Sequence, residues 1–86
     1  MRIKVTQPNT EFASQCVTIR INDHRFELGP GDSKEVESDI SHCEVRAQCG
    51  SFCKNVTVRH DSEIIIRWDV TNEDMRLEWK AYNIRK

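Results

Sequence analysis

The chain has 86 residues, of which 37% are hydrophobic and 31% are charged, and its formal net charge is -1. A chain of this length buries about 60–65% of its unfolded surface in one core, so we expect a single domain over residues 1–86. The balanced charge argues against the strongly basic field of nucleic-acid-binding and membrane-surface proteins. Eight Ile and seven Val against two Leu favour β-sheet, because β-branched side chains fit a pleated surface.

Segments in which polar and apolar residues alternate run along the chain, separated by turn residues. Alternation places every second side chain on one face, so each segment can bury one side against a partner sheet. In chain order, the expected strands are Arg2–Thr6, Val17–Ile21, Phe26–Leu28, Ser33–Glu37, Cys43–Ala47, Lys54–Val58, Ile64–Val70 and Met75–Ile84. Turns are expected at Asn22–Arg25, with His24 as the left-handed residue, and at Gly29–Asp32. The pattern predicts an all-β fold: a small two-sheet antiparallel β-sandwich of about seven or eight short strands.

The last expected hairpin has one apolar face. This face is formed by Ile64, Ile66, Trp68, Val70, Met75, Leu77, Trp79 and Ala81. A four-residue loop, Thr71–Asp74, predicts that Trp68 pairs with Leu77 and that Ile66 pairs with Trp79. We therefore expect both tryptophans to be buried. The predicted core consists of Val17, Ile19, Ile21, Phe26, Val45, Val58, Ile66, Trp68 and Leu77.

Two alternatives remain for this part of the chain. The segment Asn72–Lys86 could form a helix, because Met75, Trp79 and Tyr82 follow a helical spacing. Either tryptophan could instead lie on the surface and bind a sugar or a protein, since Trp is enriched in interface hot spots. Phe12, in the connector before Val17, is expected to contact the core.

Turn signatures in the middle of the chain resemble those of PEGA-type β-sandwiches. Ile19–His24 resembles the family's first strand with its I-D-G turn, and Leu28–Val36 resembles its L-x-P-G-E section. At the family's G-x-H corner, the usual Gly falls at Ser41 and the usual His at Cys43. The resemblance implies an immunoglobulin-like or prealbumin-like sandwich that acts as an accessory or interaction module, without catalysis.

The four cysteines are the main candidates for chemistry. Cys43, Cys49, Cys53 and His42 could supply the ligands of a tetrahedral zinc. Only one cysteine spacing fits a structural zinc site, and Cys43 shares the parity of its apolar neighbours, so we expect no metal and free thiols in a reducing cytosol. We expect Cys43 to face inward and Cys16, Cys49 and Cys53 to be accessible. The alternative is a Cys49–Cys53 disulfide formed on air oxidation.

The remaining residues point to no reaction. The three histidines have no nucleophile or carboxylate at a recognised catalytic spacing, so we expect neither an enzyme nor a cofactor. Met1–Val5 lacks the apolar run of a secretory signal, and no stretch is long enough to span a bilayer. We therefore expect a soluble cytoplasmic protein with no membrane or nucleic-acid partner.

The predicted function is a non-enzymatic interaction module that binds a protein partner. An open sheet edge or a strand face would provide the contact, because the unpaired backbone groups of an edge strand can pair with an added strand. The alternatives are a zinc-stabilised structural domain and a small inhibitor protein of the phage or mobile-element type.

Overall fold

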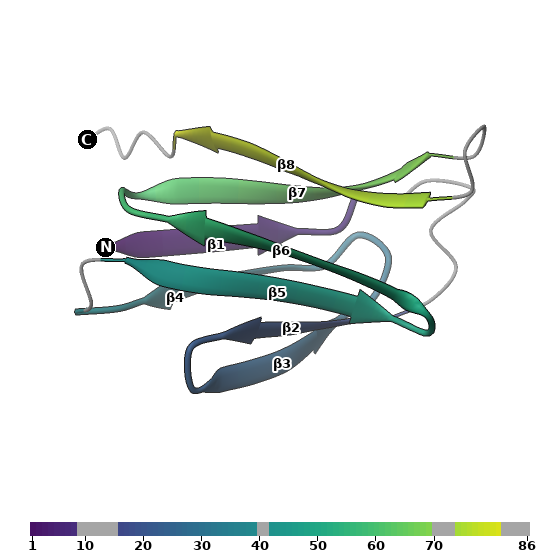
Figure 1. The fold of residues 1–86 in the computed structure, drawn as a ribbon, viewed down its shortest axis with the longest axis horizontal. Helices are drawn as coiled ribbons and strands as arrows, with labels where there is room; N and C mark the ends of the chain where they lie inside the picture. The colour runs from purple at the N-terminus through teal and green to yellow at the C-terminus, as the bar shows by residue number, and fades with distance from the viewer. Residues whose placement is uncertain (9–15, 40–41, 70–73, 82–86) are drawn as a thin grey trace.

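The computed structural model describes residues 1–8, 16–39, 42–69 and 74–81. It contains two four-stranded sheets packed face to face, which confirms the predicted all-β sandwich (Figure 1). Sheet A has the order β4-β1-β7-β8, and sheet B has the order β3-β2-β5-β6. The strands are β1 (Arg2–Thr6), β2 (Val17–Ile21), β3 (His24–Leu28), β4 (Ser33–Glu37), β5 (Cys43–Cys49), β6 (Phe52–Val58), β7 (Ser62–Asp69) and β8 (Asp74–Ala81). Within the described ranges, there is no helix capable of crossing a membrane.

The turns between neighbouring strands of sheet B are tighter than expected. Asn22 carries the positive φ of 52° in the β2–β3 turn, and His24, expected within that turn, is the first residue of β3. In the β5–β6 turn, Gly50 has a φ of 58°, a conformation that glycine adopts at little steric cost. The tight turn lengthens this hairpin beyond the prediction, so that β5 runs to Cys49 and β6 begins at Phe52.

Sheet A is mixed, so the expectation of purely antiparallel sheets is wrong for one ladder. Strand β1 pairs antiparallel with β4 and parallel with β7. The other strand pairs that the structure describes are antiparallel. A parallel pair cannot be joined by a tight turn, and here the chain passes through sheet B between β1 and β7.

The last hairpin is formed by strands, because β8 occupies most of the segment for which a helix was the alternative. Its register differs by two residues from the prediction: Trp68 pairs with Met75, and Ile64 pairs with Trp79. The predicted pairs Trp68–Leu77 and Ile66–Trp79 are therefore wrong, although the shift leaves every side chain on its expected face. The predicted contact of Phe12 and the positions of residues 70–73 and 82–86 lie outside the described residues.

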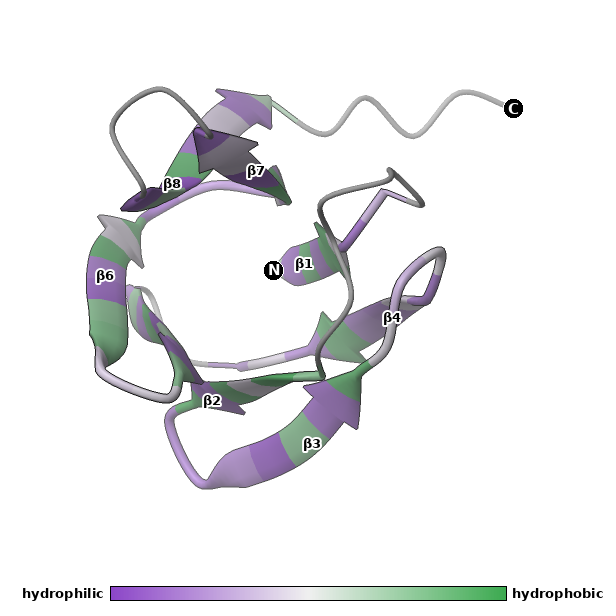
Figure 2. Cartoon of the chain, turned by 90° about the vertical axis from the view of Figure 1, so that its right-hand side faces the viewer, coloured by the Kyte–Doolittle hydropathy of each residue, from purple (hydrophilic) through white to green (hydrophobic). Residues whose placement is uncertain are grey.

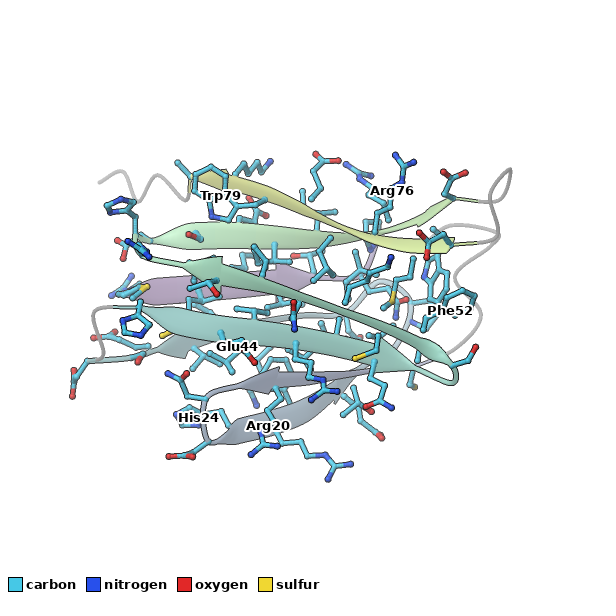
Figure 3. All side chains as sticks on the ribbon, in the orientation of Figure 1. Arg20, His24, Glu44, Phe52, Arg76 and Trp79 are labelled. Carbon is cyan, nitrogen blue, oxygen red and sulfur yellow. The ribbon has the colours of Figure 1, made fainter. Side chains whose placement is uncertain are left out.

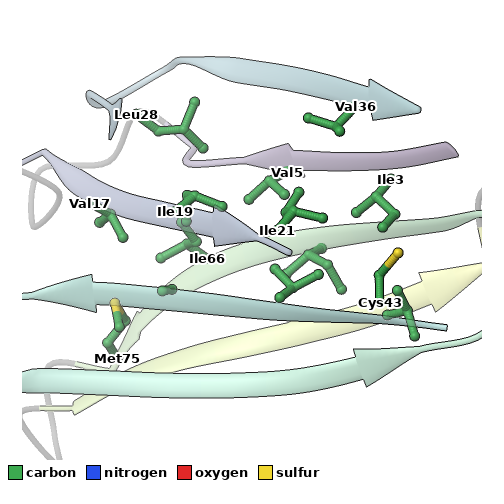
Figure 4. Close-up of a cluster of buried hydrophobic side chains, with 14 of the residues drawn as sticks. Ile3, Val5, Val17, Ile19, Ile21, Leu28, Val36, Cys43, Ile66 and Met75 are labelled. Atoms are coloured by element: carbon green, nitrogen blue, oxygen red, sulfur yellow. The ribbon is translucent and has the colours of Figure 1, made fainter. Parts of the chain in front are cut away.

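The space between the sheets is filled by aliphatic side chains (Figure 4). Figure 2 shows the alternation of hydrophilic and hydrophobic residues along strands that surround this core. Of the predicted core residues, Phe26, Trp68 and Leu77 are only half-buried at its margin. The buried hydrophobic residues are Ile3, Val5, Val17, Ile19, Ile21, Leu28, Val36, Cys43, Val45, Ala47, Cys49, Val58, Ile64, Ile65, Ile66 and Met75.

A buried polar residue, Gln7, joins the two sheets at one end of the core. Its amide Nε2 donates a hydrogen bond to the carbonyl oxygen of Leu28 at 2.8 Å, and its Oε1 accepts one from Trp68 Nε1 at 2.9 Å. The ring of Phe52 packs edge-on against that of Trp68, with their centroids 5.8 Å apart. Trp68 is therefore held by both a polar and an aromatic contact at the margin of the core.

Candidate binding surfaces

The structure does not bring the four candidate zinc ligands together. Cys43 and Cys49 face the core from the two ends of the seven-residue strand β5, about 20 Å apart along the strand. Cys53 lies on the outer face of β6, and His42 is exposed before β5. Among the residues that the structure describes, no group of three or more His, Cys, Asp or Glu side chains is placed to bind a metal ion.

The thiols divide into two buried and two exposed groups. Cys43 is buried and Cys16 is exposed, as expected, but Cys49, expected to be accessible, is buried. Burial raises the pKa of the Cys49 thiol, and the neighbouring Cys16 raises it further. Cys53 pairs with Gln48 on the outer face of sheet B, whereas Cys49 points into the core. Because Cys49 and Cys53 point to opposite faces, the strand geometry opposes a disulfide between them, and none of the four cysteines forms a disulfide.

Trp79, expected in the core, is 48% exposed and is the exposed large hydrophobic residue of the described part of the chain. It lies on β8, an edge strand of sheet A, and points to the surface (Figure 3). Its partner across the ladder, Ile64, is fully buried. The apolar face of the hairpin, which carries Ile64 and Trp79, thus continues beyond the part that sheet B covers.

An open hollow of about 380 Å³ lies beside the indole ring of Trp79, lined mainly by apolar atoms of residues 56–60 on and after β6. The ring itself is fixed, because its Nε1 donates a hydrogen bond to Ser62 Oγ at 2.8 Å. The same Ser62 hydroxyl donates to the carbonyl oxygen of His60 at 2.6 Å. The hollow thus combines a mainly apolar lining with an oriented indole, and Arg59 and His60 are its charged or titratable lining residues.

A second candidate surface is the outer face of sheet B. Arg20 pairs with Arg25 on β3 and with Arg46 on β5, so three guanidinium groups lie in one line across three neighbouring strands. We call these residues the arginine row. Figure 3 shows Arg20 on the outside of this sheet, far from Trp79.

Among the described residues, no carboxylate forms an ion pair with the arginine row. Glu44, two residues from Arg46 on the same face, attracts the Arg46 guanidinium without pairing with it, and lines a hollow with Arg20 and Arg46. Arg20 Nε donates to the carbonyl oxygen of Asn22 at 3.2 Å, and Arg46 Nε donates to Cys53 Sγ at 3.1 Å. The contact with Cys53 raises the pKa of Arg46. A hollow of about 220 Å³ opens over the row and is also lined by Thr18 and Gln48.

Sequence reasoning missed the arginine row, and it offered a surface position for Trp79 only as an alternative to the core. Alternation predicts that Arg20 and Arg46 point outward, but the charged residues were interpreted only as solvated strand faces. Trp79 lies on the apolar face of the last hairpin, as predicted, but the alternation does not show that sheet B leaves the end of this face uncovered. The pairing of β2 with β5 joins segments that are distant in sequence, so it left no local signal.

Comparison with protein-family models, with curated proteins and with solved structures finds no match to this chain. What the protein does is therefore inferred from its two candidate surfaces. Both consist of groups that bind: an oriented indole beside an apolar hollow in one, and a line of guanidinium groups in the other.

Proposed function

We propose that this protein is a non-enzymatic interaction module that binds a protein partner through Trp79 and the hollow beside it. The half-exposed indole on an edge strand is the observation that supports this proposal most directly. Tryptophan is enriched among the few residues that dominate the binding energy of protein interfaces. Removing the exposed apolar surface of Trp79 and of the hollow from water favours association.

The partner is a protein segment that presents an apolar or aromatic side chain to the hollow. The lining is apolar, so a charged or strongly hydrated group would lose its hydration there without gaining a partner. The hydrogen bond to Ser62 fixes the indole before binding, which lowers the entropy lost when the complex forms. Arg59 and His60 supply the polar rim that surrounds the apolar centre of most interfaces.

Selection of peptides from a displayed random library on the folded protein tests this proposal. We expect the enriched peptides to share an apolar or aromatic anchor and to bind the Trp79→Ala variant about 30-fold more weakly, the loss typical of a hot-spot residue. Glu78→Ala is the matched control, because Glu78 lies next to Trp79 on the opposite face of β8 and should leave binding unchanged. Circular dichroism would establish that both variants are folded. Enriched peptides that bind parent and Trp79→Ala equally would contradict the proposal.

The PEGA-like resemblance, the inhibitor alternative and a cytoplasmic location are all compatible with an interaction module and stay predictions. A zinc-stabilised domain would need ligands other than a joint set of Cys43, Cys49, Cys53 and His42, since these lie apart. Elemental analysis of protein purified without added metal decides this alternative. One equivalent of zinc, together with a lower melting temperature after chelation, would support the structural-zinc function.

A further inference from the structure

We propose that the arginine row is a second binding site, which takes a short acidic segment of a protein and recognises the carboxylates of its Asp or Glu side chains. This site lies on the outer face of sheet B, whereas Trp79 lies on sheet A. The proposal does not depend on the function assigned to Trp79.

The arginine row is costly for the isolated fold. Arg25, Arg20 and Arg46 are direct cross-strand neighbours, and neighbouring strands are about 5 Å apart. Like charges placed directly opposite each other destabilise a sheet. Three positive charges within roughly 10 Å, with no ion pair among the described residues, therefore form a site that gains from binding an anion.

Sheet A shows how the same chain neutralises arginines that face each other. Arg67 pairs with Arg76 across the β7–β8 ladder, in the same direct arrangement as the pairs of the arginine row. Here each arginine has a carboxylate: Arg67 lies 3.2 Å from Glu78, and Arg76 lies 3.2 Å from Asp69. A hollow of about 490 Å³ lies over these paired charges. The arginine row has no such ion pair among the described residues.

Other charged residues on sheet A are also placed beside charges of the opposite sign. One rung of this sheet alternates in sign, because Lys4 lies between Glu35 and Glu63, and Glu63 forms an ion pair with Lys80 at 3.4 Å. Another ion pair joins Arg2 to Glu37 at 3.5 Å. Sheet A thus places opposite charges side by side, whereas the arginine row places three like charges side by side.

The free groups of the arginine row match a carboxylate. The intramolecular hydrogen bonds of Arg20 and Arg46 use their Nε atoms, and both side chains are exposed, so their terminal nitrogens are accessible to a ligand. A guanidinium fork binds a carboxylate with two parallel hydrogen bonds. Thr18 and Gln48 line the same hollow and add a hydroxyl and an amide as further donors.

The surroundings of the arginine row favour an acidic peptide over a nucleic acid. Glu27 and Glu44 stand on the same face, at two residues from Arg25 and Arg46, and they would repel a long polyanion. The outward residues of the four strands of sheet B include no aromatic ring on which a base could stack. A short segment with two or three carboxylates carries less negative charge for Glu27 and Glu44 to repel.

Fluorescence anisotropy with a labelled peptide tests this site. The probe carries three glutamates separated by serines, and the same peptide with glutamines is the uncharged reference. We expect the glutamate peptide to bind the parent at low salt, more weakly as salt is added, and about tenfold more weakly to the double variant Arg20→Gln/Arg46→Gln. Arg67→Gln/Arg76→Gln changes the net charge by the same amount and should leave binding unchanged.

The stability of the two double variants separates binding from a structural role. If the arginine row repels itself, Arg20→Gln/Arg46→Gln should keep or raise the melting temperature while it loses the peptide. Equal binding of both peptides, equal loss in both double variants, or tighter binding of a single-stranded oligonucleotide than of the glutamate peptide would overturn the proposal. A clear loss of melting temperature in Arg20→Gln/Arg46→Gln, with peptide binding retained, would also overturn it.

Discussion

Replacing Gln7 by leucine should destabilise the sandwich strongly, although leucine has nearly the same volume. Gln7 is fully buried, and the change leaves the carbonyl oxygen of Leu28 and the indole nitrogen of Trp68 without their partner. A buried polar group left unpaired costs about 1–3 kcal/mol, and the added apolar side chain offsets part of this. We expect the free energy of unfolding to fall by about 2–4 kcal/mol. The total free energy of unfolding of a domain of this size is roughly 4–13 kcal/mol.

Urea unfolding at 25 °C, followed by far-UV circular dichroism, measures this loss. Gln48→Leu is the matched control, because Gln48 is exposed on the outer face of β5 and should change the free energy by less than about 0.5 kcal/mol. In a Trp68→Phe background, the cost of Gln7→Leu should shrink by about 0.5–1.5 kcal/mol, since one of its two bonds is already lost. A Gln7→Leu variant as stable as the parent would refute the role of this network.

Three further outcomes follow from burial. The Thr6 hydroxyl is buried without a hydrogen-bond partner among the described residues, so Thr6→Val should raise the free energy of unfolding by about 1 kcal/mol, and a loss in urea unfolding would contradict this. Timed alkylation with mass spectrometry should give two fast thiols, Cys16 and Cys53, and two slow ones, Cys43 and Cys49; fast labelling of Cys43 would show that the strand register is wrong. Because burial raises the pKa of Cys49, the unfolded chain ionises there first, so the free energy of unfolding should fall as the pH rises above about 8.5, and Cys49→Ala should lose this part of the pH profile.

The faces of the strands could be predicted because one side of each sheet is buried. Val17, Ile19 and Ile21 alternate with polar residues, and all three lie in the core. A strand that slipped by one residue would exchange its apolar face for its polar one, so the pattern strongly determines the facing. The same reasoning predicts that Cys43 points inward, and Cys43 is buried in the structure.

Alternation does not determine which residues stand opposite each other. A slip of two residues keeps every side chain on its face, and this is the difference between the predicted and observed pairing of β7 with β8. In the observed register, Asp69 can form its ion pair with Arg76. Nor does alternation show how far the facing sheet extends, which is why Trp79 was expected in the core.

The arginine row depends on a turn that the sequence signals only in part. The stretch Asn22–Arg25 was expected to be a four-residue turn, which would have kept Arg25 out of any strand. Asn22 adopts a positive φ instead, and β3 begins at His24, so that Arg25 stands directly opposite Arg20. Pairing of β2 with β5 then adds Arg46 to the same line. A net charge near zero therefore coexists with an unpaired line of positive charge, because strand register, rather than composition, decides which charges are neighbours.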